Sequence, residues 1–398
     1  MRILWSSNAA HAATGYSSQT KGVVPAIKAM GHDVAVHAWW GLQGGPVVLD
    51  GIQHFPAYLD GYGNDAMPHL CRKWKADVLI TLIDLWVMDP ALGQMGSTRY
   101  CPYFPIDCDP IPAEIAARFP FAHRILLYSQ SAVKLVEAYQ GGRFKDKVRY
   151  LPHGIDGALL QPATPEERVT FRRKYYADWP EDAYIVGMVA ANKGYPSRKS
   201  FPEAMEAFAR FAARHDNARL YLHSYAGPEM KGPPLIDMIR FYGIENKARI
   251  ANNMMIVGGE YTDEMMREIY ATFDVLLAPS QGEGFCLPQV EVQAVGVPVI
   301  VTDFSAQTEN MGVGWTVPPA RLQPTLLWSN MALADVAGVA HALEESYRRP
   351  KSPLWGQMAR EFALQFDWPK VIPYWAKLLE ELDGGRRELA LEFVGARD

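Results

Sequence analysis

Two glutamates, eight positions apart, form the pattern with the clearest chemical meaning. Glu283 lies between Gly282 and Gly284, and Glu291 follows Pro288. Glycines let a backbone approach a ligand closely, and a proline in the first turn marks a helix start, whose free amides favour an anion. A carboxylate beside an anion is useful only if it binds something else, and sugar hydroxyls are suitable neutral partners. Taken alone, Glu283 is better explained by a surface turn and Glu291 by a helix-dipole role, but the two together indicate a joint site for an anion and a sugar.

A pair of basic residues, Arg198 and Lys199, precedes a second predicted helix. The sequence from Ser200 to Glu203 has the pattern of a capping box, with Ser200 as the N-cap. Cleavage of a sugar–phosphate bond leaves negative charge on the diphosphate, and fixed positive charges lower that barrier. Lys199 is the candidate for this role, although a basic pair ahead of a helix is by itself more often a solvated feature.

Patterns for metals and nicotinamide cofactors are weak. Asp107-Cys108-Asp109 has the Asp-x-Asp spacing, but we expect it to lie away from the diphosphate loops because it belongs to the first half of the chain. Gly15 follows the first predicted strand without a G-x-G-x-x-G pattern, which argues against a dinucleotide. We therefore expect no metal and no cofactor.

Apolar runs of strand length alternate with amphipathic helices along the chain, which predicts an α/β fold with parallel sheets. Ligands of such sheets bind at the carboxyl ends of strands. The loops after the first strand, and after the strands that end near 190 and 279, should therefore carry the chemistry. The predicted strands are Arg2–Ser7, His32–Trp40, Asp77–Leu82, Cys101–Ile106, Arg124–Tyr128, Val148–Leu151, Tyr184–Ala190, Arg219–Ser224, Ile250–Val257, Asp274–Pro279 and Pro298–Thr302.

Composition narrows the class of protein. A length of 398 residues favours two domains, and 49% apolar with 21% charged residues is typical of a globular chain. A net charge of -5 makes nucleic acid an unexpected ligand. The four cysteines show no zinc or disulfide spacing, which predicts reduced thiols and a cytoplasmic location. We expect no signal peptide and no transmembrane segment.

The glutamate pattern resembles a known family. Glu283-Gly284-Phe285-Cys286-Leu287-Pro288 through Glu291, followed by Gly296-Val297-Pro298, is similar to the E-x7-E signature of retaining glycosyltransferase family 4, whose members have the GT-B fold. A cysteine, Cys286, stands where the family usually has a glycine. The resemblance extends from the first strand to about Pro318, with further matches at Thr14-Gly15-Tyr16, Gly31-His32-Asp33-Val34, Pro152-His153-Gly154-Ile155-Asp156 and Arg198-Lys199.

The resemblance implies roles for the matching residues. Glu283 would face the donor sugar, Lys199 would neutralise the departing diphosphate, and Glu291 would hold the ribose hydroxyls. The loop that connects the two glutamates would also bind the donor, through Gly284, Phe285, Cys286 and Leu287.

Four further positions follow from the same resemblance. Asn192 stands where the family usually has an arginine, so Arg198 would supply the second positive charge. The loop at Gly15 would lie against the diphosphate or the acceptor. Asp107 would take the place of a histidine that contacts the donor sugar, as a ligand or a base, and a plain turn is the competing interpretation.

These inferences give one overall prediction. Two Rossmann-like, doubly wound domains would span 1–160 on the acceptor side and 161–365 on the nucleotide-sugar side, followed by a helical tail, 366–398, packed back on the first domain. The chain would be a retaining, metal-independent glycosyltransferase that uses a UDP- or GDP-type sugar donor. Alternatives are a glycosyl phosphorylase or sucrose-synthase-like enzyme, a DNA-modifying glycosyltransferase, and a non-catalytic binding protein. The acceptor stays open among a sugar, a lipid head group, a protein and a small molecule.

Overall fold

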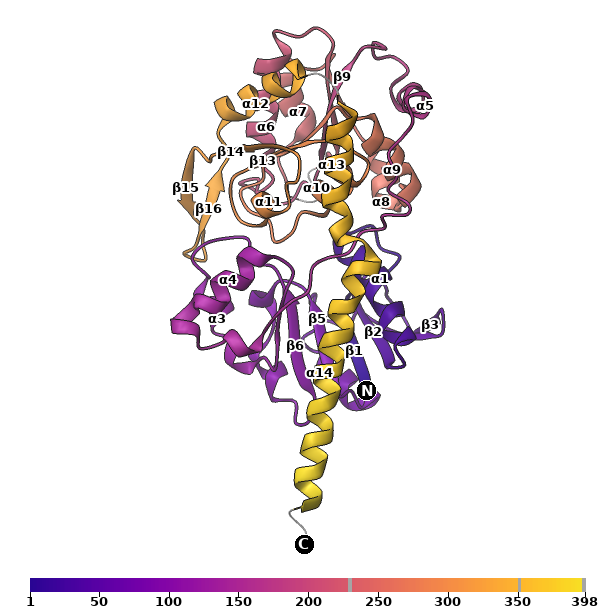
Figure 1. Ribbon diagram of the computed structural model, residues 1–398, viewed down its shortest axis with the longest axis vertical. Coiled ribbons are helices and arrows are strands. Elements are labelled where there is room, and N and C mark those ends of the chain that lie inside the picture. The colour runs from indigo at the N-terminus through magenta and orange to yellow at the C-terminus, as the bar shows by residue number, and fades with distance from the viewer. Residues whose placement is uncertain (228–230, 350–351, 396–398) are drawn as a thin grey trace. The chain divides into compact units, whose positions relative to one another are not determined.

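Residues 1–227, 231–349 and 352–395 are described by the computed structural model, which Figure 1 traces from indigo to yellow. The chain forms two compact units. Unit 1 comprises Met1–Pro105, Ala113–Gly154 and Trp368–Asp398, and unit 2 comprises Ile106–Pro112 and Ile155–Asp367. The division therefore falls at Gly154 rather than at the predicted residue 160, and a short loop from the first half of the chain belongs to unit 2.

Unit 1 is built on an eight-stranded sheet in the order β3-β4-β2-β1-β5-β6-β7-β8, in which only the β3–β4 pair is antiparallel. Counted among the parallel strands, the order begins 3-2-1-4-5-6, which is the Rossmann arrangement. The strands are β1 (Arg2–Asn8), β2 (Asp33–Trp40), β3 (Val47–Leu49), β4 (Ile52–Pro56), β5 (Val78–Leu82), β6 (Arg99–Phe104), β7 (Ile125–Leu127) and β8 (Val148–Tyr150). The β3–β4 hairpin was not expected from the sequence.

The helices of unit 1 lie in the connections between these strands, except for the last, which follows unit 2 in the sequence. They are α1 (Gly15–Ala29), α2 (Met67–Trp74), α3 (Ala113–Ala116), α4 (Gln130–Ala138) and α14 (Trp368–Gly395), with short 3-10 turns at η1 (Leu85–Val87), η2 (Pro90–Gln94), η3 (Phe119–Phe121), η4 (Tyr139–Gly142) and η5 (Lys145–Lys147). The first helix begins with an N-cap, because the Thr14 hydroxyl accepts a hydrogen bond from the Ser17 amide at 3.1 Å.

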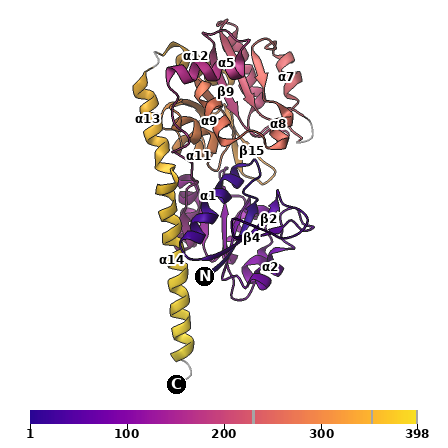
Figure 2. The same cartoon turned by 90° about the vertical axis from the view of Figure 1, so that its right-hand side faces the viewer.

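The last helix, α14, belongs to unit 1 although it lies more than 200 residues away from β8 in the sequence. It is the long yellow helix of Figures 1 and 2. Its fully buried Trp375 packs against the rings of Trp5 and Tyr103, with centroid separations of 5.6 and 5.3 Å. One turn and a half further on, Glu381 pairs with Arg124 and Arg149. The tail is thus part of the core of unit 1.

Unit 2 repeats the same topology in a six-stranded, all-parallel sheet of order β11-β10-β9-β12-β13-β14. The strands are β9 (Tyr184–Val189), β10 (Ala218–His223), β11 (Ala248–Ile250), β12 (Val275–Ala278), β13 (Val299–Thr302) and β14 (Gly314–Val317), followed by an antiparallel hairpin of β15 (Arg321–Pro324) and β16 (Asn330–Leu333). Two sheets with the same strand order confirm the predicted α/β fold class.

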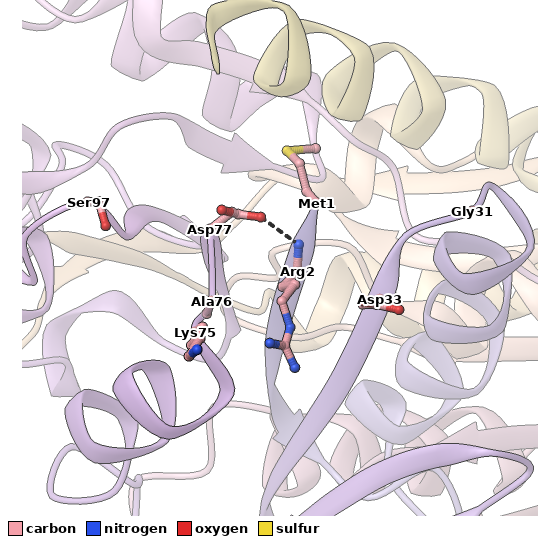
Figure 3. A pocket seen from close by; sticks show the side chains of 8 residues that line it. All are labelled: Met1, Arg2, Gly31, Asp33, Lys75, Ala76, Asp77 and Ser97. Carbon is pink, nitrogen blue, oxygen red and sulfur yellow. Dashed lines mark hydrogen bonds between the residues drawn. The ribbon is translucent and has the colours of Figure 1, made fainter. Parts of the chain in front are cut away.

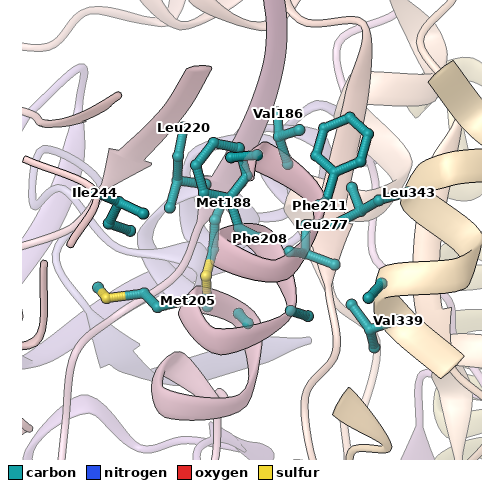
Figure 4. Close-up of a cluster of buried hydrophobic side chains, with 14 of the residues drawn as sticks. Val186, Met188, Met205, Phe208, Phe211, Leu220, Ile244, Leu277, Val339 and Leu343 are labelled. Carbon is teal, nitrogen blue, oxygen red and sulfur yellow. The ribbon is translucent and has the colours of Figure 1, made fainter. Parts of the chain in front are cut away.

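Helices of unit 2 cover its sheet and enclose a continuous apolar core. They are α5 (Pro165–Tyr176), α6 (Phe201–Ala212), α7 (Leu235–Phe241), α8 (Asn253–Gly258), α9 (Asp263–Thr272), α10 (Leu287–Ala294), α11 (Ala306–Glu309), α12 (Val336–Arg348) and α13 (Pro353–Ala363), with a 3-10 turn at η7 (Leu364–Phe366). Figure 4 shows Phe208 and Phe211 of α6 packed between strand residues such as Leu277 and the α12 residues Val339 and Leu343.

Two local predictions in unit 2 were wrong. The strand predicted over 250–257 ends at Ile250, because Asn252 caps a new helix by accepting hydrogen bonds from the amides of Met254 and Met255. The capping box at Ser200 does not form. Ser200 precedes α6 in a left-handed conformation (φ 54°), and its hydroxyl makes no hydrogen bond to a described residue.

The α14 packing gives a testable prediction. Replacing Trp375 with alanine empties a fully buried site in unit 1 and should lower the free energy of unfolding by about 3–5 kcal/mol. Urea unfolding of the full chain, followed by circular dichroism, measures this loss. The exposed Lys377 of the same helix provides the control, since Lys377→Ala should change stability little. Equal stability of both variants would show that α14 is not part of the core.

Candidate functional site

The site lies in unit 2 at the point where the strand order reverses. The parallel strands β9 and β12 are neighbours at the centre of the sheet. The strands that follow β9 are added on one side of this pair, and those that follow β12 are added on the other side. Where the strand order reverses in this way, a crevice opens at the carboxyl ends of the strands. The loop after β9 carries the basic pair, and the loop after β12 carries Glu283. Gln281 joins the two loops: its amide donates to the Arg198 carbonyl at 2.8 Å, and its side chain donates to the Ser197 carbonyl at 3.2 Å.

Glu283 and Lys199 form a direct, largely buried ion pair at this point. The other carboxylate oxygen lies 3.4 Å from Nη1 of Arg198. Burial by itself would raise the pKa of Glu283, but the charges of Lys199 and Arg198, with hydrogen bonds from Lys199 and Ser280, lower it to about 2. Glu283 is therefore an ionised carboxylate at neutral pH, and it can only accept hydrogen bonds.

The backbone around Glu283 is held from behind by residues that the sequence analysis did not single out. The Glu283 amide donates to the Ser305 hydroxyl at 2.9 Å, and Asn310 donates to the Phe285 carbonyl at 2.7 Å. A buried glutamine of α10, Gln293, accepts from the amides of Gly312 and Val313 at 2.8 and 3.1 Å. The signal in the sequence that could have revealed these supporting residues is the presence of Gln and Asn in segments that are otherwise apolar.

The loop that contains Asp107 corrects a prediction. Asp107 belongs to unit 2 and lies 3.3 Å from Nη1 of Arg198, so the Asp-x-Asp segment is not away from the basic pair. Two backbone hydrogen bonds of 3.2 and 2.9 Å fix Asp109 to Asn330 of β16. A β-carbon on Gly282 would lie 2.0 Å from the Asp107 carbonyl oxygen, so the close approach of these two loops requires a glycine at that position. The error arose because sequence order said nothing about which unit the loop joins.

Glu291, the second glutamate, has an environment unlike that of Glu283. It lies on α10 and accepts a hydrogen bond from the Tyr270 hydroxyl of α9 at 2.7 Å. Burial raises its pKa to about 7, and no arginine or lysine of the described residues forms an ion pair with it. Tyr270 is a second residue that the sequence analysis missed, because an (i, i+21) contact between two helices has no local signature.

The loop from Gly284 to Leu287 leads into α10 through an unusual turn. Cys286 is the N-cap residue and has φ 68° and ψ 72°, in the left-handed region. This conformation costs a residue with a β-carbon about 1–2 kcal/mol, and glycine adopts it freely. Phe285 is buried and packs against Phe366, with centroids 5.1 Å apart. The family that the sequence resembles usually has a glycine at position 286, and the left-handed backbone at Cys286 favours a glycine there.

Asn192 and Gly15 form none of the contacts described above for Glu283. The side-chain amide of Asn192 donates to the carbonyls of Tyr225 and Pro233 at 3.3 and 2.9 Å, so it ties down a neighbouring loop. Gly15 is the exposed first residue of α1 in unit 1. The donor-binding roles of both residues stay predictions.

Figure 3 shows a cavity in unit 1 at the amino ends of its strands. It has a volume of about 470 Å³ and lies where β1 and β2 begin, with the Arg2 amide bonded to Asp77 at 2.7 Å. Ligands of such sheets bind at the carboxyl ends of the strands, so we assign this cavity no catalytic role. In the described residues, no cluster of three or more His, Cys, Asp or Glu side chains could hold a metal ion, and no helix is long and apolar enough to cross a bilayer.

The fold and the sequence of unit 2 define the class of protein. Residues 184–328 match the family described as Glycosyl transferases group 1. The whole chain superimposes on GT-B glycosyltransferases, which confirms the predicted GT-B fold. Sucrose-phosphate synthase from Thermosynechococcus elongatus has a TM-score of 0.70 at 15% identity, over 97% of this chain and 100% of that one. Anabaena HepE in complex with UDP-glucose has a TM-score of 0.68 at 14% identity, over 96% and 100%.

Sequence relatives agree with this class. The putative glycosyltransferase EpsF of Bacillus subtilis is 28% identical over 200 residues, which are 50% of this chain and 47% of EpsF. Mannosylfructose-phosphate synthase of Agrobacterium fabrum is 25% identical over 174 residues, or 42% of this chain and 35% of that protein. The chain thus matches less than half the length of these relatives. The chain has the GT-B fold, and its residues 184–328 are similar to glycosyl transferases group 1.

The left-handed turn at Cys286 predicts a stabilising substitution. Cys286→Gly removes the β-carbon that the turn disfavours, whereas Cys286→Ala keeps it. We expect the glycine variant to be more stable than the alanine variant by about 1 kcal/mol, measured by chemical unfolding. An alanine variant as stable as the glycine variant would contradict the strained turn.

The raised pKa of Glu291 predicts a pH dependence of stability. Between the ordinary value of 4.5 and about 7, the folded chain keeps a proton that the unfolded chain releases, so Glu291 makes stability fall as the pH rises through this window. Glu291→Gln cannot ionise and should gain roughly 1–3 kcal/mol over the parent on going from about pH 5 to about pH 8. Denaturant unfolding at both pH values tests this, with the exposed Glu264→Gln as control; parallel pH profiles for Glu291→Gln and the parent would refute the assignment.

Proposed function

We propose that this chain is a glycosyltransferase that moves a sugar from a nucleotide-diphosphate donor to an acceptor hydroxyl. The observation that carries the proposal is the buried Lys199–Glu283 pair, with Arg198 beside it, at the strand-order reversal of unit 2. The match of residues 184–328 to glycosyltransferases group 1 covers this site and supports the proposal.

The chemistry of the pair suits such a transfer. The bond to be broken joins the sugar to the diphosphate, and negative charge grows on the diphosphate as it leaves. Lys199 and Arg198 are fixed cations that would stabilise this charge. Glu283 is ionised and accepts hydrogen bonds only, so it would bind the hydroxyls of the donor sugar rather than the phosphates. When the donor binds, its phosphates would contact Lys199 and its sugar hydroxyls would contact Glu283, in place of the direct Lys199–Glu283 contact.

The remaining parts of the proposal rest on the family resemblance and on the relatives. We propose retention of the anomeric configuration, Glu291 as the ligand of the ribose hydroxyls, and a reaction without a metal. A uridine donor is favoured over guanosine because the similar structure of HepE was determined with UDP-glucose. The four cysteines are free thiols, which supports a reducing, cytoplasmic compartment.

A glycosyl phosphorylase or a sucrose-synthase-like enzyme is the second candidate. Two of the similar proteins are named as synthases of phosphorylated sugars: sucrose-phosphate synthase and mannosylfructose-phosphate synthase. Inorganic phosphate is a substrate of a phosphorylase alone, so consumption of phosphate with formation of a sugar phosphate would identify that activity. A sucrose-synthase-like enzyme would instead be identified by a sugar as its acceptor.

The role of Lys199 can be tested with matched lysine variants. Lys199→Met should lower nucleoside diphosphate release from UDP-glucose or GDP-mannose by about 100- to 1,000-fold, because an aimed charge in the leaving-group site is lost. Lys199→Arg keeps a cation and should lose less. Lys193→Met alters an exposed lysine of the same loop and should leave turnover unchanged. A chelator should leave the parent's rate unchanged.

Circular dichroism and the melting temperature establish that each variant is folded. Normal turnover by a folded Lys199→Met protein would refute the proposed role of the lysine.

A further inference from the structure

Unit 1 presents a group of exposed aromatic rings along one edge of its sheet. Trp40 ends β2, Tyr58 and Tyr62 follow β4, and Trp86 follows β5. Their side chains are between 43% and 57% exposed. The strands β4, β2, β1 and β5 are consecutive in the sheet, and all four are parallel, so their carboxyl ends lie along one edge. We call these four residues the aromatic edge.

The loops that carry these rings are tied to one another. The Ala57 amide donates to the Leu42 carbonyl at 3.0 Å. Asn64 joins the loop after β4 to the loop after β5, since its side chain donates to the Val87 carbonyl at 3.0 Å and accepts from the Asp89 amide at 2.8 Å.

Gly63 lets the loop after β4 pack closely against the sheet. A β-carbon there would lie 2.2 Å from the ring of the buried His37, and the glycine has φ 81°. The four rings are thus about half exposed, on loops that hydrogen bond to one another at one edge of the sheet. Exposed apolar groups along one edge mark a candidate binding surface.

The charge of these loops selects the kind of ligand. Residues 39–71 and 83–98 contain no lysine or arginine, and their five aspartates are Asp50, Asp60, Asp65, Asp84 and Asp89. Anionic lipid surfaces and phosphorylated ligands are attracted by basic clusters, so this surface disfavours both. A ring's negative face attracts the polarised C–H groups on one side of a sugar, and this contact needs no ligand charge.

We propose that the aromatic edge binds a neutral sugar ring, and that the acceptor of the transfer is a neutral carbohydrate. The claim about the acceptor rests on the proposed function, because the aromatic edge lies in unit 1 and the donor residues lie in unit 2. The claim about sugar binding stands on the aromatic rings, the hydrogen-bonded loops and the acidic charge alone.

Saturation-transfer NMR without any donor tests the proposal. The probes are the methyl glycosides of glucose, galactose and mannose, together with maltose and cellobiose. We expect transfer to the C–H protons of at least one probe, and an affinity about 3- to 10-fold weaker in Trp40→Ala and in Trp86→Ala, which is the contribution of one aromatic contact. The control, Phe241→Ala, removes an aromatic ring of unit 2 that is 82% exposed and should change nothing.

Binding of UDP and GDP, measured by calorimetry, separates the two proposals. A chain that binds a nucleotide but none of the sugars overturns the aromatic-edge inference and leaves the proposed function standing. A chain that binds a sugar through Trp40 and Trp86 but binds no nucleotide keeps the sugar site and overturns the transferase. Equal sugar binding in all variants places the sugar elsewhere and overturns the inference.

Vesicles provide the last comparison, because Leu59 in the same loops is fully exposed and could enter a bilayer. Co-sedimentation with phosphatidylcholine–phosphatidylglycerol vesicles that is lost in Trp40→Ala, without sugar binding, would make the edge a membrane surface. The inference predicts no such co-sedimentation.

Discussion

The candidate site of unit 2 depends on one buried carboxylate and the cation that compensates it. Removing Glu283 from water is costly unless a partner neutralises it, and Lys199 does so directly. The two residues come from loops 84 positions apart, so the pair can form only if β9 and β12 are neighbours and both loops are held in register. The hydrogen bonds of Gln281 to the loop after β9 supply that register.

Three non-glycine residues with positive φ lie in the segments that surround Glu283. Ser200, Cys286 and Ser305 all have positive φ, with values of 54°, 68° and 53°, although none is a glycine. Each adjoins the candidate site: Ser200 follows Lys199, Cys286 begins α10, and the Ser305 hydroxyl accepts from the Glu283 amide. Strained backbone persists where the surrounding contacts determine it, and such positions concentrate at functional sites. The loops are thus shaped to hold charged groups at the end of the sheet.

The sequence predicted what depends on local pattern and missed what depends on distant contacts. Alternating apolar runs were sufficient to predict the parallel sheets, and the glutamate spacing singled out Glu283 and Glu291, whose roles stay predictions. The pattern at Ser200 suggested a capping box, but the left-handed turn needed beside the basic pair overrides that preference. The position of Asp107 beside Arg198 and the bond from Tyr270 to Glu291 join segments that no sequence window contains.

A crystal structure of the chain soaked with UDP tests the central claim most directly. The account predicts that a phosphate oxygen lies within hydrogen-bond distance of the Lys199 ammonium, and that the direct contact between Lys199 and Glu283 is replaced or shared. UDP bound at another place, with the Lys199–Glu283 pair unchanged and no phosphate near Arg198, would contradict it.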